Sequence, residues 1–386
     1  MAQLPPIAAG PAEALHSGIR EIANAALQTP GAIRLDVGQP DFRTPDHIGE
    51  AGKLAIDQGF TFYTPTTGLA SLRERIAAKV QRVNGYSVDA EQIACAPGGV
   101  GAAAAAFAAV LECGDEVLLP DPCWPNYRLM LAWTGTRGVF YPCRPEDGYQ
   151  PDPEAVAALV TPRTKLLVIN SPNNPTGAVL SRDLLQALGE IAERHNLWVL
   201  SDDCYDEIVL EGEAPSLAAL RRDGRMIAVY TFSKTYAMTG WRLGYAIAEP
   251  HVIDSITKVL ESNSSCTSTI TQKAAEAALD GPQDCVGIMV DAYRRRRDLV
   301  VDLLREAGLL LSVPTGAFYI MADVSPRGGD SREFAFRLLR ERGVSVAPGT
   351  AFGSLGRGAV RISLASSDAD LREGVGRLCE FVREAS

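Results

Sequence analysis

From about residue 93 the chain alternates short apolar runs with stretches of helical period, and this alternation restricts the fold more than any other feature. The apolar runs are IACAP (93–97), EVLLP (116–120), KLLVIN (165–170), LWVLSDD (197–203) and MIAVYTFS (226–233). An Ala-rich stretch after Pro97 and SRDLLQALGEIAERHN (181–196) are among the helical patterns between them. Strands that are apolar along their length and joined by helices are typical of a parallel sheet covered on both faces. We therefore predict an α/β fold.

The pattern changes near residue 284, where a long charged helix is expected to run to about residue 308. Short strands at 317–324, 344–349 and 360–365 then mix with helices at 331–343 and 368–385. A chain of 386 residues exceeds what one core usually fills. We predict a large domain over 46–283 and a smaller α+β domain over 284–386. The Pro- and Gly-rich segment 1–45 is expected to form an irregular arm and part of the small domain.

The charge and cysteine content exclude several classes of function. A net charge of −10 argues against nucleic-acid binding, which needs excess basic charge. The run Arg294–Arg297 is expected to form a solvated or subunit-facing surface. The eight cysteines show no CxxC spacing and indicate reduced thiols in a cytoplasmic protein. The four histidines are isolated, so we expect no metal site.

No stretch of the sequence indicates a membrane protein. The start MAQLPPIAAG has neither the basic nor the apolar region of a signal peptide. The longest apolar run, 100–111, is shorter than the roughly 20 residues that a membrane span needs. We expect a soluble protein.

The loop IACAPGGVGAAAA allows two interpretations with a ligand. Gly99, Gly101 and Ala104 fit the dinucleotide pattern G-x-G-x-x-A after a strand, and Asp121 follows Gly101 by twenty residues. That pattern usually opens its domain, however, and here about 90 residues precede it. The same loop could hold one phosphate monoester at the helix N-terminus, or could be only a tight turn. The loop alone does not decide between them.

Polar and aromatic side chains follow several of the predicted strands. They occupy 121–127, 170–177, 202–205 and 233–234. Ligands of an open parallel sheet bind at the carboxyl ends of its strands. A binding site is therefore expected at this rim.

The stretch TFSKTYAMTGWRLGY (231–245), preceded by SPNNPTG (171–177) and SDDCY (201–205), resembles the pyridoxal-phosphate-dependent aminotransferases of classes I and II. Further matches are LDVGQPDF (35–42), YTPTTGLASLR (63–73), DPCWPNY (121–127), GAFYIM (316–321) and VRISLA (360–365). Together they span nearly the whole chain. The resemblance implies the fold type I, aspartate-aminotransferase-like architecture, with 46–283 as the domain that binds pyridoxal 5′-phosphate.

The resemblance also implies the catalytic residues. Lys234 would form a Schiff base with the cofactor, and a lysine in that role must lose its proton near neutral pH, which desolvation and a nearby cation favour. Asp202 would pair with the pyridine nitrogen and keep it protonated. Tyr205 and Asn174 would hydrogen-bond the phenolic oxygen.

Further cofactor contacts follow from the same resemblance. The phosphate would be held by Arg242, by the Thr231 and Ser233 hydroxyls, and by the backbone N–H groups of Gly98, Gly99 and Val100. Trp124 would stack on the pyridine ring. Tyr63 would reach the phosphate from the other subunit, which implies a homodimer with its site at the interface.

Substrate recognition is expected at Arg361, because a guanidinium fork binds a carboxylate in bidentate fashion. Gly38 would lie in a loop that closes over this carboxylate, and Asn174 would also contact the substrate. Val100 stands where some aspartate-specific relatives carry a lysine. The expected amino donor is therefore neutral or aromatic.

The implied reaction moves an amino group from an amino acid to a 2-oxo acid by a ping-pong mechanism. Lyases and synthases on the same fold, such as carbon–sulfur lyases and enzymes like aminocyclopropane-carboxylate synthase, are an alternative, because the bond that breaks depends on pocket geometry. A regulator that uses this domain as a sensor is a third possibility, but the chain shows no basic helix-turn-helix pattern. The donor, the acceptor and the pathway are not specified by the motifs.

Overall fold

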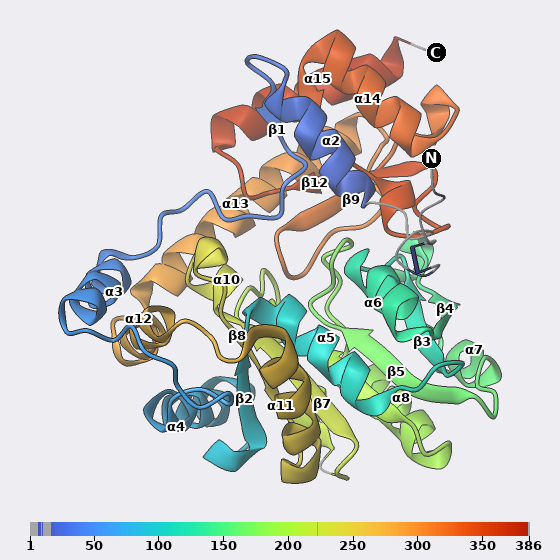
Figure 1. Ribbon diagram of the computed structural model, residues 1–386. Coiled ribbons are helices and arrows are strands. Elements are labelled where there is room, and N and C mark those ends of the chain that lie inside the picture. The colour runs from blue at the N-terminus through green and yellow to red at the C-terminus, as the bar shows by residue number, and fades with distance from the viewer. Residues whose placement is uncertain (1–6, 9, 11–16, 222, 385–386) are drawn as a thin grey trace, which may run out of the picture.

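The computed structural model describes residues 7–8, 10, 17–221 and 223–384, and its centre is a mostly parallel sheet (Figure 1). The strands lie in the order β2 (Ile93–Ala96), β8 (Gly244–Ile247), β7 (Met226–Thr231), β6 (Trp198–Asp202), β5 (Thr164–Asn170), β3 (Glu116–Asp121) and β4 (Arg137–Pro142). Only β8 among them runs antiparallel to its neighbours. The predicted parallel sheet is confirmed, although the sequence patterns did not indicate β4 and β8.

Helices cover both faces of this sheet because successive strand side chains point to opposite sides. Val117 and Leu119 pack in one apolar cluster, whereas Leu118 packs in another. The first cluster includes residues of α5 (Gly98–Val110), α6 (Asn126–Thr134) and α11 (Pro250–Ser264). The second includes residues of α7 (Pro153–Ala158) and α8 (Arg182–Arg194). A third, around β2, β7 and β8, takes residues of α3 (Asp46–Asp57), α4 (Ala70–Lys79), α9 (Leu217–Leu220) and α12 (Thr269–Asp280).

The C-terminal part has a core of its own. The long helix α13 (Asp284–Glu306) leads into an antiparallel sheet of β11 (Ala347–Pro348), β12 (Ala359–Ser363) and β9 (Tyr319–Asp323). Helices α14 (Ser331–Arg342) and α15 (Asp368–Arg383) pack on it. The helices and strands predicted from residue 93 onward are confirmed, with ends shifted by a few residues, except at 344–349. The single strand expected there is divided into β10 (Val344–Ser345) and β11 (Ala347–Pro348), which belong to different sheets.

The N-terminal segment packs against this C-terminal part. Helix α2 (Gly18–Leu27) lies beside α14, and β1 (Ile33–Arg34) pairs in parallel with β10 (Val344–Ser345) (Figure 1). Irregular structure was expected over residues 1–45, and this prediction is wrong for α2. Ile22 and Ala26 lie four residues apart on one helical face and are buried in the C-terminal core.

Two of the four consecutive arginines are buried. The run Arg294–Arg297 was expected on a solvated or subunit-facing surface, and this is wrong for Arg296 and Arg297, each 7% exposed within the single chain. Residues of α13 next to them, such as Tyr293 and Val300, belong to the C-terminal core. Arg296 and Arg297 lie on that face, where acidic side chains and backbone carbonyls accept their hydrogen bonds.

The remaining helical segments are short. They are α10 (Phe232–Thr235), η1 (Val80–Asn84), η2 (Ala90–Gln92), η3 (Pro145–Asp147), η4 (Thr239–Trp241), η5 (Ser325–Arg327) and η6 (Gly349–Ala351). In the part of the chain that the structure describes, no helix has the length and apolar character needed to cross a membrane.

Candidate active site

A cavity of about 250 Å³ lies at the carboxyl ends of β5, β6 and β7, next to the C-terminal sheet. Every site residue expected from the sequence lines this cavity except Gly98 and Tyr63. The lining residues are Ile19, Gly38, Gly99, Val100, Trp124, Asn170, Asn174, Asp202, Cys204, Tyr205, Thr231, Ser233, Lys234, Arg242, Tyr319 and Arg361. The fold thus brings residues far apart in sequence to one place.

Lys234 lies in α10, directly after β7, and points into the cavity. Its Nζ donates a hydrogen bond to the carbonyl oxygen of Gly38 at 2.7 Å. Desolvation in the cavity, opposed by Cys204 and aided by the positive charges of Arg361 and Arg242, lowers the pKa of Lys234 to about 8. A substantial fraction of this amine is therefore neutral near physiological pH, as a nucleophilic lysine requires.

Asp202 ends β6 and is buried at the floor of the cavity. Its Oδ1 accepts from the Cys204 backbone N–H at 3.2 Å, and its Oδ2 accepts from the Tyr127 hydroxyl. Burial raises the pKa of Asp202, and these hydrogen bonds oppose that rise. A carboxylate held so firmly is well placed to pair with a cationic ring nitrogen.

Sequence reasoning missed Tyr127 as a partner of Asp202. The signal was present in DPCWPNY, where Tyr127 follows Trp124 by three residues at the start of α6. The two rings lie edge to face, with centroids 5.4 Å apart. Trp124 therefore lines the cavity while Tyr127 lies behind it and reaches Asp202.

Arg361 is held in β12 with its guanidinium facing the cavity. Nη1 donates to Asn174 Oδ1 at 2.9 Å, and Nη2 donates to the Asp36 carbonyl oxygen at 2.6 Å. The guanidinium also lies 4.3 Å from the Tyr319 ring centroid and 4.9 Å from that of Phe352. Its Nε is buried and has no hydrogen-bond partner among the described residues. A buried donor without a partner is costly, so this group is suited to receive an anionic ligand.

Tyr319 is a second residue that the sequence motifs did not single out. Its hydroxyl lies 2.8 Å from the hydroxyl of Tyr205, and burial raises the pKa of Tyr205, so both phenols are neutral. A Cβ on Gly38 would lie 2.1 Å from the Tyr319 hydroxyl oxygen. Gly38 is thus required by the approach of Tyr319.

The N-terminus of α5 forms the other end of the cavity, together with Thr231, Ser233 and Arg242. The Thr231 hydroxyl donates to Ser233 Oγ at 3.0 Å, and Arg242 Nη1 donates to the Thr239 carbonyl oxygen at 2.9 Å. Gly98 does not line the cavity, but its φ is +76° and a Cβ there would lie 2.4 Å from Arg242 Nη2. Backbone N–H groups, two hydroxyls and a guanidinium lie together here, and these are donors that could hold one phosphate.

The position of Asp121 contradicts the dinucleotide interpretation of the glycine loop. Asp121 Oδ2 accepts from the Ser354 backbone N–H at 3.1 Å, and Asp121 does not line the cavity. It joins the end of β3 to the C-terminal part instead. The phosphate-monoester interpretation is the one that this geometry supports.

Tyr63 lies away from the cavity of its own chain, with 90% of its surface exposed. Its neighbour Phe62 is 81% exposed. Within one subunit neither side chain contacts the site.

The chain is similar to known proteins over most of its length. Residues 30–378 match the family described as aminotransferase class I and II. The aspartate/prephenate aminotransferase of Thermus thermophilus is 40% identical over 92% of this chain and 91% of its own. Aromatic-amino-acid aminotransferase 2 of Thermococcus litoralis is 38% identical over 95% and 96%. The solved structure of the Thermus thermophilus aspartate aminotransferase with maleate superposes with a TM-score of 0.93, at 38% identity over 98% of this chain and 100% of that one.

The chain therefore belongs to the class I and II aminotransferases of fold type I. It is an aminotransferase, and members of this family depend on pyridoxal phosphate. The residues present fit that cofactor. The cavity offers an amine of lowered pKa, a buried carboxylate and a helix N-terminus with backbone N–H donors, each at a different part of its lining.

Proposed function

We propose that this chain transfers the amino group of a neutral or aromatic amino acid to a 2-oxo acid by a ping-pong mechanism, with the cofactor bound to Lys234 as a Schiff base. The observation that carries the proposal is the convergence of Lys234, Asp202 and Arg361 on one cavity. The lowered pKa of Lys234 supports its role, because only the neutral amine can attack an aldehyde carbon.

Each part of the lining has a role in holding the cofactor. Arg242, Ser233, Thr231 and the N–H groups at the start of α5 would neutralise the phosphate. Asp202, oriented by Tyr127, would keep the ring nitrogen protonated. Tyr205 and Asn174 would donate hydrogen bonds to the phenolic oxygen, and Trp124 would cover the ring.

When bound, the cofactor supplies an electron-withdrawing ring that makes the Cα proton of the amino acid acidic. Arg361 would bind the substrate carboxylate through its guanidinium, with the unpartnered Nε as one donor. The carboxylate then lies at a fixed distance from Lys234, whose released Nζ takes the proton from Cα. Water must enter for the 2-oxo acid to leave, and the second 2-oxo acid uses the same contacts in reverse.

The preference for a neutral or aromatic donor rests on Val100. The cationic side chains lining the described cavity are Lys234, Arg242 and Arg361, and each has a role with the cofactor or the substrate carboxylate. Val100 presents an apolar surface instead. The names of the relatives include both aspartate and aromatic amino acids. The apolar side chain of Val100 favours an aromatic amino donor over aspartate.

We further propose a homodimer in the cytoplasm. The adjacent exposed rings of Phe62 and Tyr63 support a subunit contact that brings Tyr63 to the phosphate of the partner. The free thiols of all eight cysteines support a reducing compartment.

Within each subunit we propose a cofactor-binding domain over 46–283 and a small domain made of 284–386 with the segment 1–45.

Replacing Lys234 tests the assignment directly. Lys234→Ala should retain the cofactor through its phosphate and ring contacts, yet lower the rate of amino transfer by about a hundredfold or more, since a positioned base contributes roughly 10²–10⁴-fold. Borohydride reduction followed by peptide mass analysis should attach the cofactor to Lys234 in the wild type only. Lys165→Ala, which changes an exposed lysine, is the control. Near-normal turnover in Lys234→Ala would refute the role of Lys234.

The donor is identified by adding amino acids singly to the purified holoenzyme. The visible absorbance of the cofactor should bleach with phenylalanine, tyrosine or a neutral amino acid, and respond weakly to aspartate. A protein without a visible band would contradict the cofactor assignment itself.

A further inference from the structure

We call the segment 34–44 the strap. It is held by elements that carry the site residues. The Ser366 hydroxyl donates to the Arg34 carbonyl oxygen at 2.9 Å. The Ser363 N–H donates to the Leu35 carbonyl oxygen at 2.8 Å. These two contacts tie the start of the strap to the residues that end and follow β12.

The middle of the strap contacts the two cations of the reaction centre. Arg361 Nη2 donates to the Asp36 carbonyl oxygen, and Lys234 Nζ donates to the Gly38 carbonyl oxygen. The position of the strap therefore determines where these two carbonyl groups meet the cavity.

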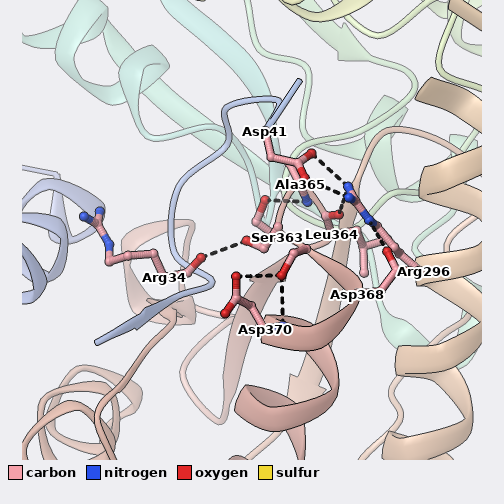
Figure 2. A network of polar contacts seen from close by, with 10 residues as sticks. Arg34, Asp41, Arg296, Ser363, Leu364, Ala365, Asp368 and Asp370 are labelled. Atoms are coloured by element: carbon pink, nitrogen blue, oxygen red, sulfur yellow. Dashed lines mark hydrogen bonds and ion pairs between the residues drawn. The ribbon is translucent and has the colours of Figure 1, made fainter. Parts of the chain in front are cut away.

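The far part of the strap is held by Arg296 of α13 (Figure 2). Nη1 and Nη2 donate to the two carboxylate oxygens of Asp41, at 2.9 and 2.7 Å. Nε donates to Asp368 Oδ1 at 2.9 Å, and Nη1 also reaches the Leu364 carbonyl oxygen at 3.4 Å. One guanidinium thus joins the strap to the segment that begins three residues after Arg361.

Neither Arg296 nor Asp41 lines the cavity. The bidentate pair between them is directional, because a planar guanidinium fork fixes the carboxylate plane as well as its distance. The Arg296 side chain is 8% exposed and the Asp41 side chain 31% exposed, so water screens this pair only in part. Arg296 can therefore affect a ligand only indirectly, through the strap or through the segment that follows β12.

We propose that Arg296 is a positioning residue for substrate binding, and that through Asp41 it holds the strap in register with β12. Gly38 and Arg361 then enclose the substrate carboxylate together. This inference rests on the proposed function in one respect, that a carboxylate binds at Arg361. It concerns the arrangement of the site and adds no chemical step.

Asp41 and Asp368 provide a matched pair of substitutions. Both carboxylates accept from Arg296, but only Asp41 belongs to the strap, whereas Asp368 lies in the first turn of α15. Asp41→Asn and Asp368→Asn each remove one negative charge from the same arginine. If Arg296 had only a structural role, both variants would lose stability, and substrate binding would change equally in the two.

The kinetic test uses the cofactor-loaded protein with its best amino donor. Asp41→Asn should raise KM by about tenfold with a smaller change in kcat, since small misplacements of binding groups have large effects. Asp368→Asn should stay within about twofold of the wild type. Arg296→Lys, which keeps the charge but loses the fork, should resemble Asp41→Asn. Equal KM values in the two Asn variants would overturn the proposal.

A second measurement separates this inference from the proposed reaction. Hydrogen exchange of peptides covering 34–44 should become faster in Asp41→Asn than in Asp368→Asn, and 3-phenylpropionate should bind the Asp41→Asn holoenzyme about tenfold more weakly, as the KM test predicts. If the wild type and the variants all lacked amino transfer, the proposed reaction would be wrong. Hydrogen exchange and 3-phenylpropionate binding would still test the role of the strap. Unchanged exchange and unchanged binding in Asp41→Asn would refute the role of Arg296.

Discussion

Desolvation acts in opposite directions on the two ionisable residues at the centre of the cavity. Burial lowers the pKa of Lys234 to about 8 and raises the pKa of Asp202. The tyrosine beside Asp202 limits the second effect, because the hydroxyl of Tyr127 donates to the carboxylate. The same surroundings thus favour a neutral amine at Lys234, while the hydrogen bond from Tyr127 opposes the protonation of Asp202.

Val100 is the residue at which the donor proposal can be tested. Val100→Lys should raise kcat/KM for aspartate by about tenfold or more, because a hydrogen bond to a charged group contributes about 1.5–3 kcal/mol. The ratio of kcat/KM between aspartate and phenylalanine measures the change. Ala108→Lys, on an exposed part of the same helix, should leave the ratio unaltered. A wild type that already prefers aspartate would show that the donor proposal is wrong.

Strand β6 shows how a period of two residues separates neighbouring carboxylates. Asp202 ends the strand facing the cavity, whereas the side chain of Asp203 points away from it and accepts from Ser201 Oγ at 2.7 Å and from Ser216 Oγ at 3.3 Å. Burial, opposed by the hydrogen bond from Ser201 and aided by the negative charge of Asp206, raises the pKa of Asp203 to about 7. Only one member of the pair is therefore available to a ligand in the cavity.

The raised pKa of Asp203 predicts a dependence of stability on pH. The folded state binds the proton more tightly than the unfolded state, so wild-type stability should fall as pH rises from about 4 through 7. Asp203→Asn removes this titration and should be more stable than wild type at pH 8, on the order of 2 kcal/mol, with a smaller difference at pH 5.

Urea unfolding of the cofactor-loaded protein at both pH values measures the effect of Asp203→Asn. Asp183→Asn, at an exposed position in the first turn of α8, is the comparison. A difference between Asp203→Asn and wild type that is independent of pH would contradict the prediction.

At the scale of the whole molecule, the cavity lies where two separately packed cores meet. The large sheet supplies Asp202, and helix α10, which directly follows β7 of that sheet, supplies Lys234. The C-terminal sheet supplies Arg361 and Tyr319. The described N-terminal segment packs with the C-terminal core and brings Gly38 to the same place. Tyr63, the remaining residue expected near the phosphate, lies on the surface.

The proposed dimer predicts a mass in solution of twice the 41.2 kDa subunit. Phe62→Asp places a charge on an exposed ring position and should shift the protein toward the subunit mass, while weakening cofactor retention because the partner's tyrosine is lost. Light scattering and cofactor release on gel filtration measure the two effects. Leu27→Asp, at another exposed apolar position, serves as the control. A fully active wild-type monomer would exclude this arrangement.

The class of fold and most of the residues that line the cavity could be predicted from the sequence. Apolar strand runs and helical periods reflect local burial, and residues such as Lys234 and Asp202 occur in motifs whose spacing is visible along the chain. The sequence patterns did not indicate β4, because Arg137 is exposed at its start, or β8, because its first two residues belong to a motif noted for its polar residues.

Only the tertiary structure decided which side chains meet across distant segments. The Tyr127 hydroxyl donates to Asp202, and the position of Tyr319 leaves room only for a glycine at position 38. Arg296 was expected on the surface, but it is buried and donates to Asp41. These contacts join residues separated by 75 to 281 positions and leave no periodic trace in the sequence. Their existence depends on how the two cores and the segment 34–44 pack together, because hydrogen bonds and close contacts act only over a few ångströms.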